Sequence, residues 1–266
     1  MKAPSPFARV AATRTLLLGF VRRELSNRYA GTLLGGLWAF GQPVLMLAIY
    51  AFVFRSVFKV QLPDGNASFV ALVACALWPW MAFQEAVQGG TTAITNNAEL
   101  VRKIFFPYEL LVIAAVLANF ALHFAGFLAV LLVLGLLGEP LHPGGLMVVA
   151  LAWSVTLILA LGFALITSAL QVAIKDVAPA LGPFFMLMFY ATPVLYPLSL
   201  VPEAIRPWME LNPLVHIVEP IRAALLDGAG ASALSTLWPV AVGAAVVLVL
   251  ARLLFRRLSA YFQDFL

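Results

Sequence analysis

Long apolar runs alternate with short polar connections along most of the chain. In hydrocarbon a backbone satisfies its hydrogen bonds only within a helix or a closed barrel, and a helix needs about 20 apolar residues to cross a bilayer. The fourth run is long enough to tilt or kink, and the start of the fifth, beside Pro179 and Pro183, is poorly defined. We therefore predict an all-α integral membrane protein with six transmembrane helices, at Leu34–Phe54, Phe69–Val87, Leu110–Leu134, Leu146–Ile174, Ala178–Leu195 and Leu237–Leu254.

The composition supports this class. The chain of 266 residues is 63% hydrophobic and 11% charged, with a mean hydropathy of +1.00. Soluble domains carry about 25% charged residues, so this chain has too few charges to cover a water-facing surface. A net charge of +4 is also compatible with nucleic-acid binding, but membrane proteins commonly carry excess basic residues in cytoplasmic loops. The single cysteine, Cys75, lies in an apolar run and is expected to be a packing residue.

The basic residues predict the orientation of the spans. Alternate connections, together with the two ends, hold 12 of the 16 Lys and Arg residues, and the remaining connections hold 4. The positive-inside rule therefore places both termini in the cytoplasm, as an even number of spans requires. The apolar patch Leu16–Leu18 runs into Arg22 and Arg23 without a small-residue cleavage site, so a cleaved signal peptide is not expected.

Residues 1–31 form a basic arm that precedes the first span. Between Pro6 and Gly31, apolar residues recur at helical spacing (Val10, Leu17, Val21 and Leu25), with arginines between them. This pattern is typical of a helix that lies in the cytoplasmic membrane interface. The alternative is a basic arm that only enforces topology.

Residues 196–236, between the fifth and sixth spans, are unusually apolar for an external connection. Two patches with helical periodicity, Val201–Leu211 and Leu214–Leu226, are interrupted by prolines, and the second ends at Asp227–Gly228, a plausible helix stop. Long connections of this kind are usually functional or buried. We expect short re-entrant helices here, although an ordinary folded external loop remains the alternative.

The sequence contains no recognisable catalytic motif. It lacks the G-x-x-x-x-G-K-[ST] phosphate loop, the G-x-S-x-G elbow and the H-E-x-x-H zinc motif. His123, His142 and His216 are far apart in sequence, and His123 is expected to be a packed or interhelical hydrogen-bonding residue. Glu85 is the only acidic residue within the predicted spans, which argues against an ion-coupled carrier. No catalytic residue, metal site or bound cofactor is predicted for this chain.

Four stretches together resemble the permease subunits of ATP-binding-cassette exporters for polysaccharides, which include exporters of O-antigen, capsule and teichoic acid. They cover nearly the whole chain in order: Arg22–Leu25 with Arg28–Tyr29, Leu34–Gly35 and Leu37–Pro43; Pro79–Trp80 through Asn97, Glu99–Lys103 and Phe105–Glu109; Lys175–Asp176 leading to Thr192–Pro197; and Leu211–Pro213 with Arg222. Lys175 departs from the pattern, because Arg is expected before Asp176, and no ligand-binding role is assigned there.

The resemblance implies a homodimer in a bacterial inner membrane, joined to two separate ATPase subunits that bind ATP and magnesium. Its substrate would be a polyprenyl-pyrophosphate-linked glycan, with O-antigen as the leading choice. Alternatives within the class are a permease for capsule, teichoic acid, a drug or a small lipid. Other classes are a membrane-embedded transferase or a structural scaffold.

The resemblance also implies three sets of site residues. Loop 91–109 would couple to the ATPase, with the interface arm beside it. Leu100, Val101 and Ile104 would be available for a cleft on the ATPase, and Glu99, Arg102 and Lys103 would face outward. The alternative for this loop is a plain basic connection that only sets the topology. The full coupling set is Asn97, Glu99, Leu100, Val101, Arg102, Lys103, Phe105, Pro107, Arg22, Arg23 and Glu24. The set expected to meet the lipid headgroup or the glycan is Arg28, Tyr29, Trp38, Tyr50, Trp78, Trp80, Phe83, Gln84, Tyr190 and Tyr196. Most aromatic residues in that set are alternatively interfacial or core residues, and Arg28 is alternatively a snorkelling anchor. The external gate set is Pro202, Glu203, Arg206, Trp208, Asn212, Pro213 and Arg222.

Overall fold

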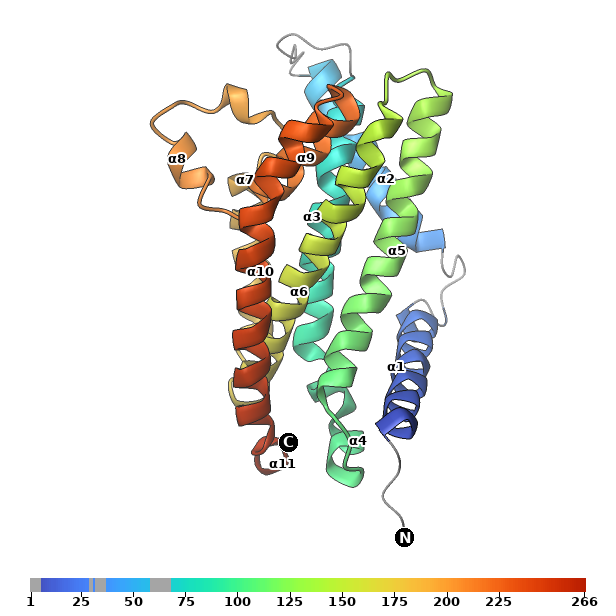
Figure 1. Ribbon diagram of the computed structural model, residues 1–266, viewed down its shortest axis with the longest axis vertical. Helices are drawn as coiled ribbons and strands as arrows, with labels where there is room; N and C mark the ends of the chain where they lie inside the picture. Colours follow the sequence, from blue (N-terminus) through green and yellow to red (C-terminus); the bar gives the residue numbers. More distant parts are fainter. Residues whose placement is uncertain (1–5, 29–30, 32–36, 58–67) are drawn as a thin grey trace.

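The computed structural model describes residues 6–28, 31, 37–57 and 68–266. All regular structure in these ranges is helical, and the long helices form a bundle (Figure 1). The helices are α1 (Pro6–Arg28), α2 (Trp38–Ala51), α3 (Phe69–Thr92), α4 (Ala98–Lys103), α5 (Glu109–Leu136), α6 (Leu146–Ala173), α7 (Val177–Ala191), α8 (Arg206–Met209), α9 (Val215–Leu226), α10 (Gly230–Ser259) and α11 (Phe262–Phe265).

Four of the predicted spans are confirmed as helices long and apolar enough to cross a membrane: α3, α5, α6 and α10. The shortest of them, α3, has 24 residues and is therefore about 36 Å long. Ser68 begins α3, since its side chain accepts a hydrogen bond from the Ala71 amide at 3.2 Å. Helix α10 begins at Gly230, about two turns before Leu237, where the sixth span was predicted to begin.

The first and fifth predicted spans correspond to shorter apolar helices. The 14 residues of α2 run directly into a six-residue π-helical segment, Phe52–Val57. The fifth was predicted to reach Leu195, but α7 ends at Ala191, where a turn begins. Thr192 holds this turn, because its hydroxyl donates to the Met188 carbonyl at 2.8 Å and accepts from the Asn212 amide at 2.8 Å.

Helix α3 lies at the centre of the bundle and packs closely against α6. Small residues permit the approach: a Cβ added to Gly90 would lie 2.6 Å from the Cβ of Ala164. Next to Gly90, the Thr91 hydroxyl shares a hydrogen bond at 2.6 Å with the hydroxyl of Thr167, which lies about one turn from Ala164 on α6. Cys75 is fully buried in α3, which confirms its predicted role as a packing residue.

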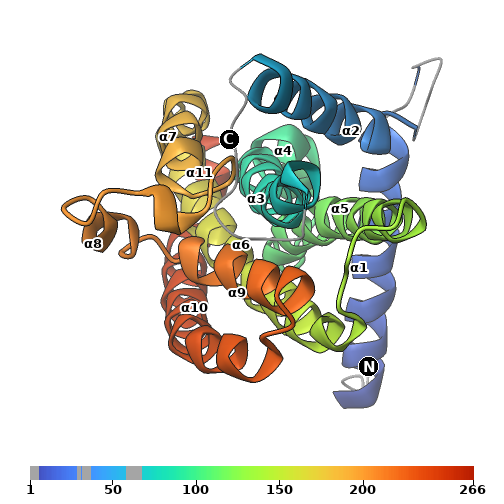
Figure 2. The ribbon, with the colours of Figure 1, turned by 90° about the horizontal axis from the view of Figure 1, so that it is seen from above.

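The connection between α7 and α10 holds one buried helix and one exposed turn of helix. Helix α9 packs against α3, α6 and α10, and it ends before Gly228, whose φ of +69° supplies the predicted stop (Figure 2). The prediction of a helical patch at Val201–Leu211 was largely wrong, because only Arg206–Met209 forms a helix, α8. Helix α8 projects away from the bundle (Figures 1 and 2).

Helix α1 confirms the helix predicted for the basic arm and packs against α5. Its packed positions recur at intervals of three and four residues, as one face of a helix requires. Phe20 contacts Phe106, which precedes α5, with ring centroids 5.7 Å apart. The packed positions are Leu17, Phe20, Val21 and Leu25.

Candidate functional site: an aromatic groove and a surface at one end of the bundle

A groove of about 530 Å³ lies between α2, α3 and α7. Helix α2 contributes Gln42, Met46 and Tyr50 to its walls, and α7 contributes residues that include Phe189 and Tyr190. The lining positions of α3 share one helical face, since they recur at intervals of three and four residues. They are Leu77, Trp80, Met81, Gln84, Glu85 and Gln88.

Four aromatic rings form one wall of this groove. Phe189 is at the centre, stacked on Tyr50 with ring centroids 6.0 Å apart and edge-on to Trp80 at 4.7 Å. Tyr190 contacts Phe189 at 5.4 Å and is itself 61% exposed. Amide side chains from Gln42, Gln84 and Gln88 line the same groove. The wall thus presents flat apolar surfaces beside uncharged donors and acceptors, which is the combination that binds polyhydroxylated ligands.

A second pocket, of about 420 Å³, adjoins the groove and shares Glu85 and Gln88 with it. Arg28, the last residue of α1, donates to the Glu85 carboxylate and to the Asn119 amide oxygen. The Nε2 atom of His123 lies 3.1 Å from Oε2 of Glu85, the same carboxylate oxygen that accepts from Arg28. His123 is thus the buried interhelical residue that was predicted, and the lone acid of the spans has two basic partners.

The structure separates the residues predicted to line a substrate path. Trp80, Gln84, Tyr50 and Tyr190 line the groove, and Arg28 lines the adjoining pocket. Trp78 is fully buried and Phe83 packs against Phe163 and Phe185, so neither of these two residues lines the groove.

Two further residues of that set lie elsewhere, and a third is not described. Trp38 is half exposed at the start of α2, beyond the groove lining. Tyr196 donates its hydroxyl to the Tyr190 carbonyl at 2.5 Å from the turn after α7. Tyr29 lies outside the described residues.

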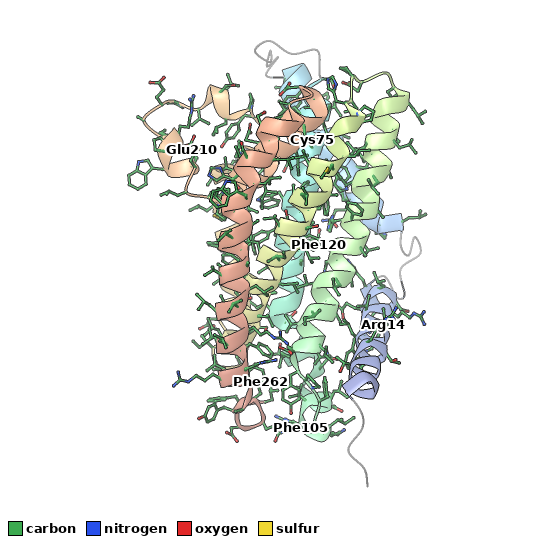
Figure 3. All side chains as sticks on the ribbon, viewed as in Figure 1. Arg14, Cys75, Phe105, Phe120, Glu210 and Phe262 are labelled. Atoms are coloured by element: carbon green, nitrogen blue, oxygen red, sulfur yellow. The ribbon has the colours of Figure 1, made fainter. Side chains whose placement is uncertain are left out.

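The predicted coupling loop lies at the end of the bundle that also holds α1 and α11, where it forms a candidate docking surface (Figure 1). A groove of about 520 Å³ runs between Arg23 of α1 and residues 95–104. Arg23 crosses it to donate to the Asn97 side chain at 2.9 Å. Ile104 and Phe105 follow α4, and Phe105 is 93% exposed, at the tip of this end (Figure 3).

The remaining coupling residues divide between this surface and the interior. Glu99, Arg102 and Lys103 face outward as predicted, with Lys103 paired to Glu99 at 3.1 Å. Val101 is fully buried, so the prediction that it is available to a partner was wrong. Of the other members, Leu100 is half buried, and Pro107, Arg22 and Glu24 are exposed.

The predicted gate residues also divide into two groups. Pro202, Glu203 and Trp208 are exposed, with Trp208 at 75%. Arg206 is half buried and donates to the Val201 carbonyl at 3.2 Å, and Pro213 is half buried at the approach to α9.

Asn212 and Arg222 are buried and make structural contacts. Asn212 bridges the turn after α7 to the Leu214 amide. Arg222 donates to the carbonyls of Leu72, Val194 and Tyr196 at 2.7–3.1 Å. Within the described ranges, no three His, Cys, Asp or Glu residues are grouped so as to hold a metal ion.

A family model for the ABC-2 type transporter matches residues 15–226 of the chain. The chain belongs to the ABC-2 type transporter family. As a family member it is a transport subunit of the membrane, and residues 15–226 include α2 to α9 and hence both the aromatic groove and the docking surface.

Named relatives extend the comparison. This ABC-2 chain is 35% identical over 214 residues to the O-antigen export system permease protein RfbA of Myxococcus xanthus, covering 79% of this chain and 80% of that protein. An RfbA of Klebsiella pneumoniae is 27% identical over 217 residues, or 80% and 81% of the two chains. The polysialic acid transport protein KpsM of Escherichia coli is 26% identical over 208 residues, or 77% and 79%.

Proposed function

We propose that this chain is the membrane-spanning subunit of an ATP-driven exporter of lipid-linked polysaccharide, with O-antigen as its substrate. The aromatic groove between α2, α3 and α7 is the observation that carries the proposal. Support for O-antigen comes from the names of the two RfbA relatives, while the similarity to KpsM favours the wider class of polysaccharides.

The chemistry of the groove suits a sugar chain that must move. The C–H face of a pyranose is apolar and packs on aromatic rings, and the hydroxyls around its edge pair with glutamine amides. Trp80, Tyr50 and Phe189 offer ring surfaces, and Gln42, Gln84 and Gln88 offer uncharged partners. Such contacts are individually weak, so a polymer can advance without being trapped at one site.

The assembly we propose is a homodimer with six spans per subunit and both termini in the cytoplasm. The apolar helix that continues from α2 into Phe52–Val57, and α7 with the turn after it, would be the first and fifth spans. Exposed apolar residues on these helices, among them Leu45, Ile49, Met186 and Leu187, offer a surface for the second copy. The aromatic groove opens between the same two helices and would therefore face the dimer axis.

Arg28 is proposed to receive the pyrophosphate of the polyprenyl carrier, because a guanidinium pairs well with phosphate oxygens. It lines the pocket that adjoins the groove through Glu85 and Gln88. A carrier phosphate would compete there with the Glu85 carboxylate, and the attached glycan would lead directly into the aromatic groove.

ATP and magnesium would be bound by two partner subunits that dock at α4 and α1. Closure of these subunits would push on α4, separate the two permeases along their seam and admit the lipid-linked glycan. The exposed α8 segment and α9 would form the outer gate. The absence of a phosphate-loop motif from this sequence fits such a division of labour.

Substitutions in the groove test the substrate. Trp80→Ala and Tyr190→Ala, expressed in a strain that lacks its own O-antigen permease, should lower surface O-antigen by about two- to tenfold, the range expected for one lost aromatic contact. Trp238→Ala removes an indole on α10 that does not line the groove, and at 65% exposed it is the matched control for Tyr190, which is 61% exposed. If Trp80→Ala and Tyr190→Ala export as much O-antigen as Trp238→Ala, the proposed path is wrong. If the strain without any permease still has intact surface O-antigen, the proposed substrate is wrong.

Substitutions on the docking surface test the ATPase partner. Glu99→Lys and Phe105→Ala change exposed side chains, so the folded permease should be retained while co-purification with its co-expressed ATPase is lost. Trp238→Ala, an exposed side chain in the first turns of α10 and outside this surface, is the control. If Glu99→Lys and Phe105→Ala retain both the ATPase and export, the docking assignment is wrong.

A further inference from the structure

The proposed docking helix α4 has only six residues. A helix of this length is marginal in water, so its position must be fixed by the contacts it makes. On one side the α1 arm reaches it through the hydrogen bond from Arg23 to Asn97. On the other side lies α11, in direct contact with α4.

Tyr108 is the centre of the contact between α4 and α11. Its hydroxyl donates to the Val101 carbonyl of α4 at 3.2 Å and accepts from the Gln263 side-chain amide of α11 at 3.2 Å. Both roles of the hydroxyl are therefore used. The buried side chain of Tyr108, which is 7% exposed, thus links Val101 of α4 to Gln263, which follows α10 in the chain.

The same contact continues through aromatic rings into α10. Phe262 stacks on Tyr108 with ring centroids 6.3 Å apart and an interplanar angle of 24°. It also packs edge-on against Phe255 of α10 at 5.4 Å. Both phenylalanines are 2% exposed, and Figure 3 shows Phe262 at the same end of the molecule as Phe105.

An ion pair one residue further along joins the same elements. Glu109, in the first turn of α5, accepts from Nε and Nη2 of Arg252 at 3.1 and 2.9 Å. Arg256 lies 3.7 Å from the same carboxylate. Two adjacent residues, Tyr108 and Glu109, therefore attach the junction between α4 and α5 to the end of α10.

We propose that Tyr108, Phe262 and Gln263 form a brace that transmits the movement of α4 to α10. The proposal rests on the proposed function, since it assumes that an ATPase pushes on α4. Residues Tyr108, Phe262 and Gln263 are positioning residues: they touch neither the glycan nor ATP, and they act through α4.

The brace gives a push on α4 a second route into the bundle. The first route is the chain itself, because α4 connects α3 to α5. The second leads through Val101, Tyr108 and Phe262 to α10, which packs along α6. When both routes act, the push on α4 moves α10 together with α3 and α5. Without the brace, α4 would tilt under the push of the ATPase, and less glycan would be exported for each ATP hydrolysed.

Tyr108→Phe is the sharpest test, because it removes the hydroxyl and keeps the ring. In the complete complex of permease and ATPase, the amount of O-antigen exported per ATP hydrolysed should fall about two- to tenfold, the factor that a net hydrogen bond contributes to an equilibrium. Co-purification with the ATPase should be unchanged. Tyr261→Phe removes the hydroxyl of a neighbouring tyrosine that is 57% exposed and should leave the ratio unchanged.

Gln263→Ala should reproduce the effect of Tyr108→Phe, and the two changes together should add little, because both break one hydrogen-bonded chain. Export per ATP that equals the wild-type ratio in both single variants overturns the brace. Loss of ATPase binding in them also overturns it, since the role would then be docking. A wild-type permease that binds no ATPase or exports no glycan refutes the proposed function instead, so the two failures are distinguishable.

Discussion

Arg222→Ala should be one of the most damaging single substitutions in this chain. Arg222 is 4% exposed and lies on α9, a helix surrounded by α3, α6 and α10. Its guanidinium donates to Leu72 of α3, to Val194 and Tyr196 in the turn after α7, and to the Glu219 carboxylate. One side chain therefore holds three separate segments together.

The magnitude follows from the groups that the substitution leaves behind. The Leu72 carbonyl belongs to α3 and keeps a place in the helical ladder, whereas the carbonyls of Val194 and Tyr196 lie in a turn and lose the donor that Arg222 provides. An unsatisfied buried carbonyl costs about 1–3 kcal/mol, so the two carbonyls together cost about 2–6 kcal/mol. Since folded proteins are stable by about 5–15 kcal/mol, this is a large share of the whole.

Thermal unfolding of the detergent-solubilised protein measures the effect. A destabilisation of that size should lower Tm by about 4 °C or more for a chain of this length. Arg206→Ala is the matched control, because Arg206 is in the same connection but donates to one carbonyl, that of Val201. Arg222→Lys should recover only part of the loss, since an ammonium cannot reach three diverging carbonyls. Equal Tm values for Arg222→Ala and Arg206→Ala refute the proposed network.

Two other substitutions test close contacts in the bundle. Gly145→Ala should destabilise the protein by about 1–3 kcal/mol, because the new Cβ would lie 2.4 Å from the Ala224 carbonyl oxygen. The control is Gly144→Ala, whose new Cβ would meet no atom within 4 Å and which should therefore leave Tm unchanged. Glu85→Gln should loosen the end of α1, since Arg28 loses its carboxylate partner. Backbone amide hydrogen exchange in α1 should therefore become faster. Exchange at the wild-type rate would mean that the ion pair does not hold α1 in place.

Local patterns were sufficient to predict the long spans and the arm. A run of apolar residues in hydrocarbon has few alternatives to a helix, so α3, α5, α6 and α10 were predicted close to their observed positions. The arm was predictable for a similar reason, because Leu17, Val21 and Leu25 repeat with the helical period. Where an end is fixed by distant residues the prediction failed, as at Ala191, where Asn212 holds the turn that ends α7.

The predicted substrate path shows a second limit, which is the direction of a side chain around its helix. Trp78 and Trp80 are two residues apart, so they point about 200° apart on α3, and only Trp80 reaches the groove. Gln84 lies one turn from Trp80 on the same face and also lines the groove. A single sequence identifies an aromatic-rich helix, but the packing of α2 and α7 decides which of its faces is the wall.

The buried charges show a third limit together with a usable signal. Glu85 is the lone acid of the predicted spans, and a carboxylate in hydrocarbon is costly unless it is paired. That cost predicts a basic partner but does not identify it. In the structure the partners are Arg28, from an arm 57 residues away, and His123, from α5.

Val101 is the converse case, an apolar residue on a short exposed helix that was predicted to be available to a partner. It is buried by Tyr108 and α11, a contact between distant parts of the chain. Both sites depend on segments brought together only by the fold, which is why substitutions at Tyr108 and Glu85 are more informative than further changes in the apolar spans.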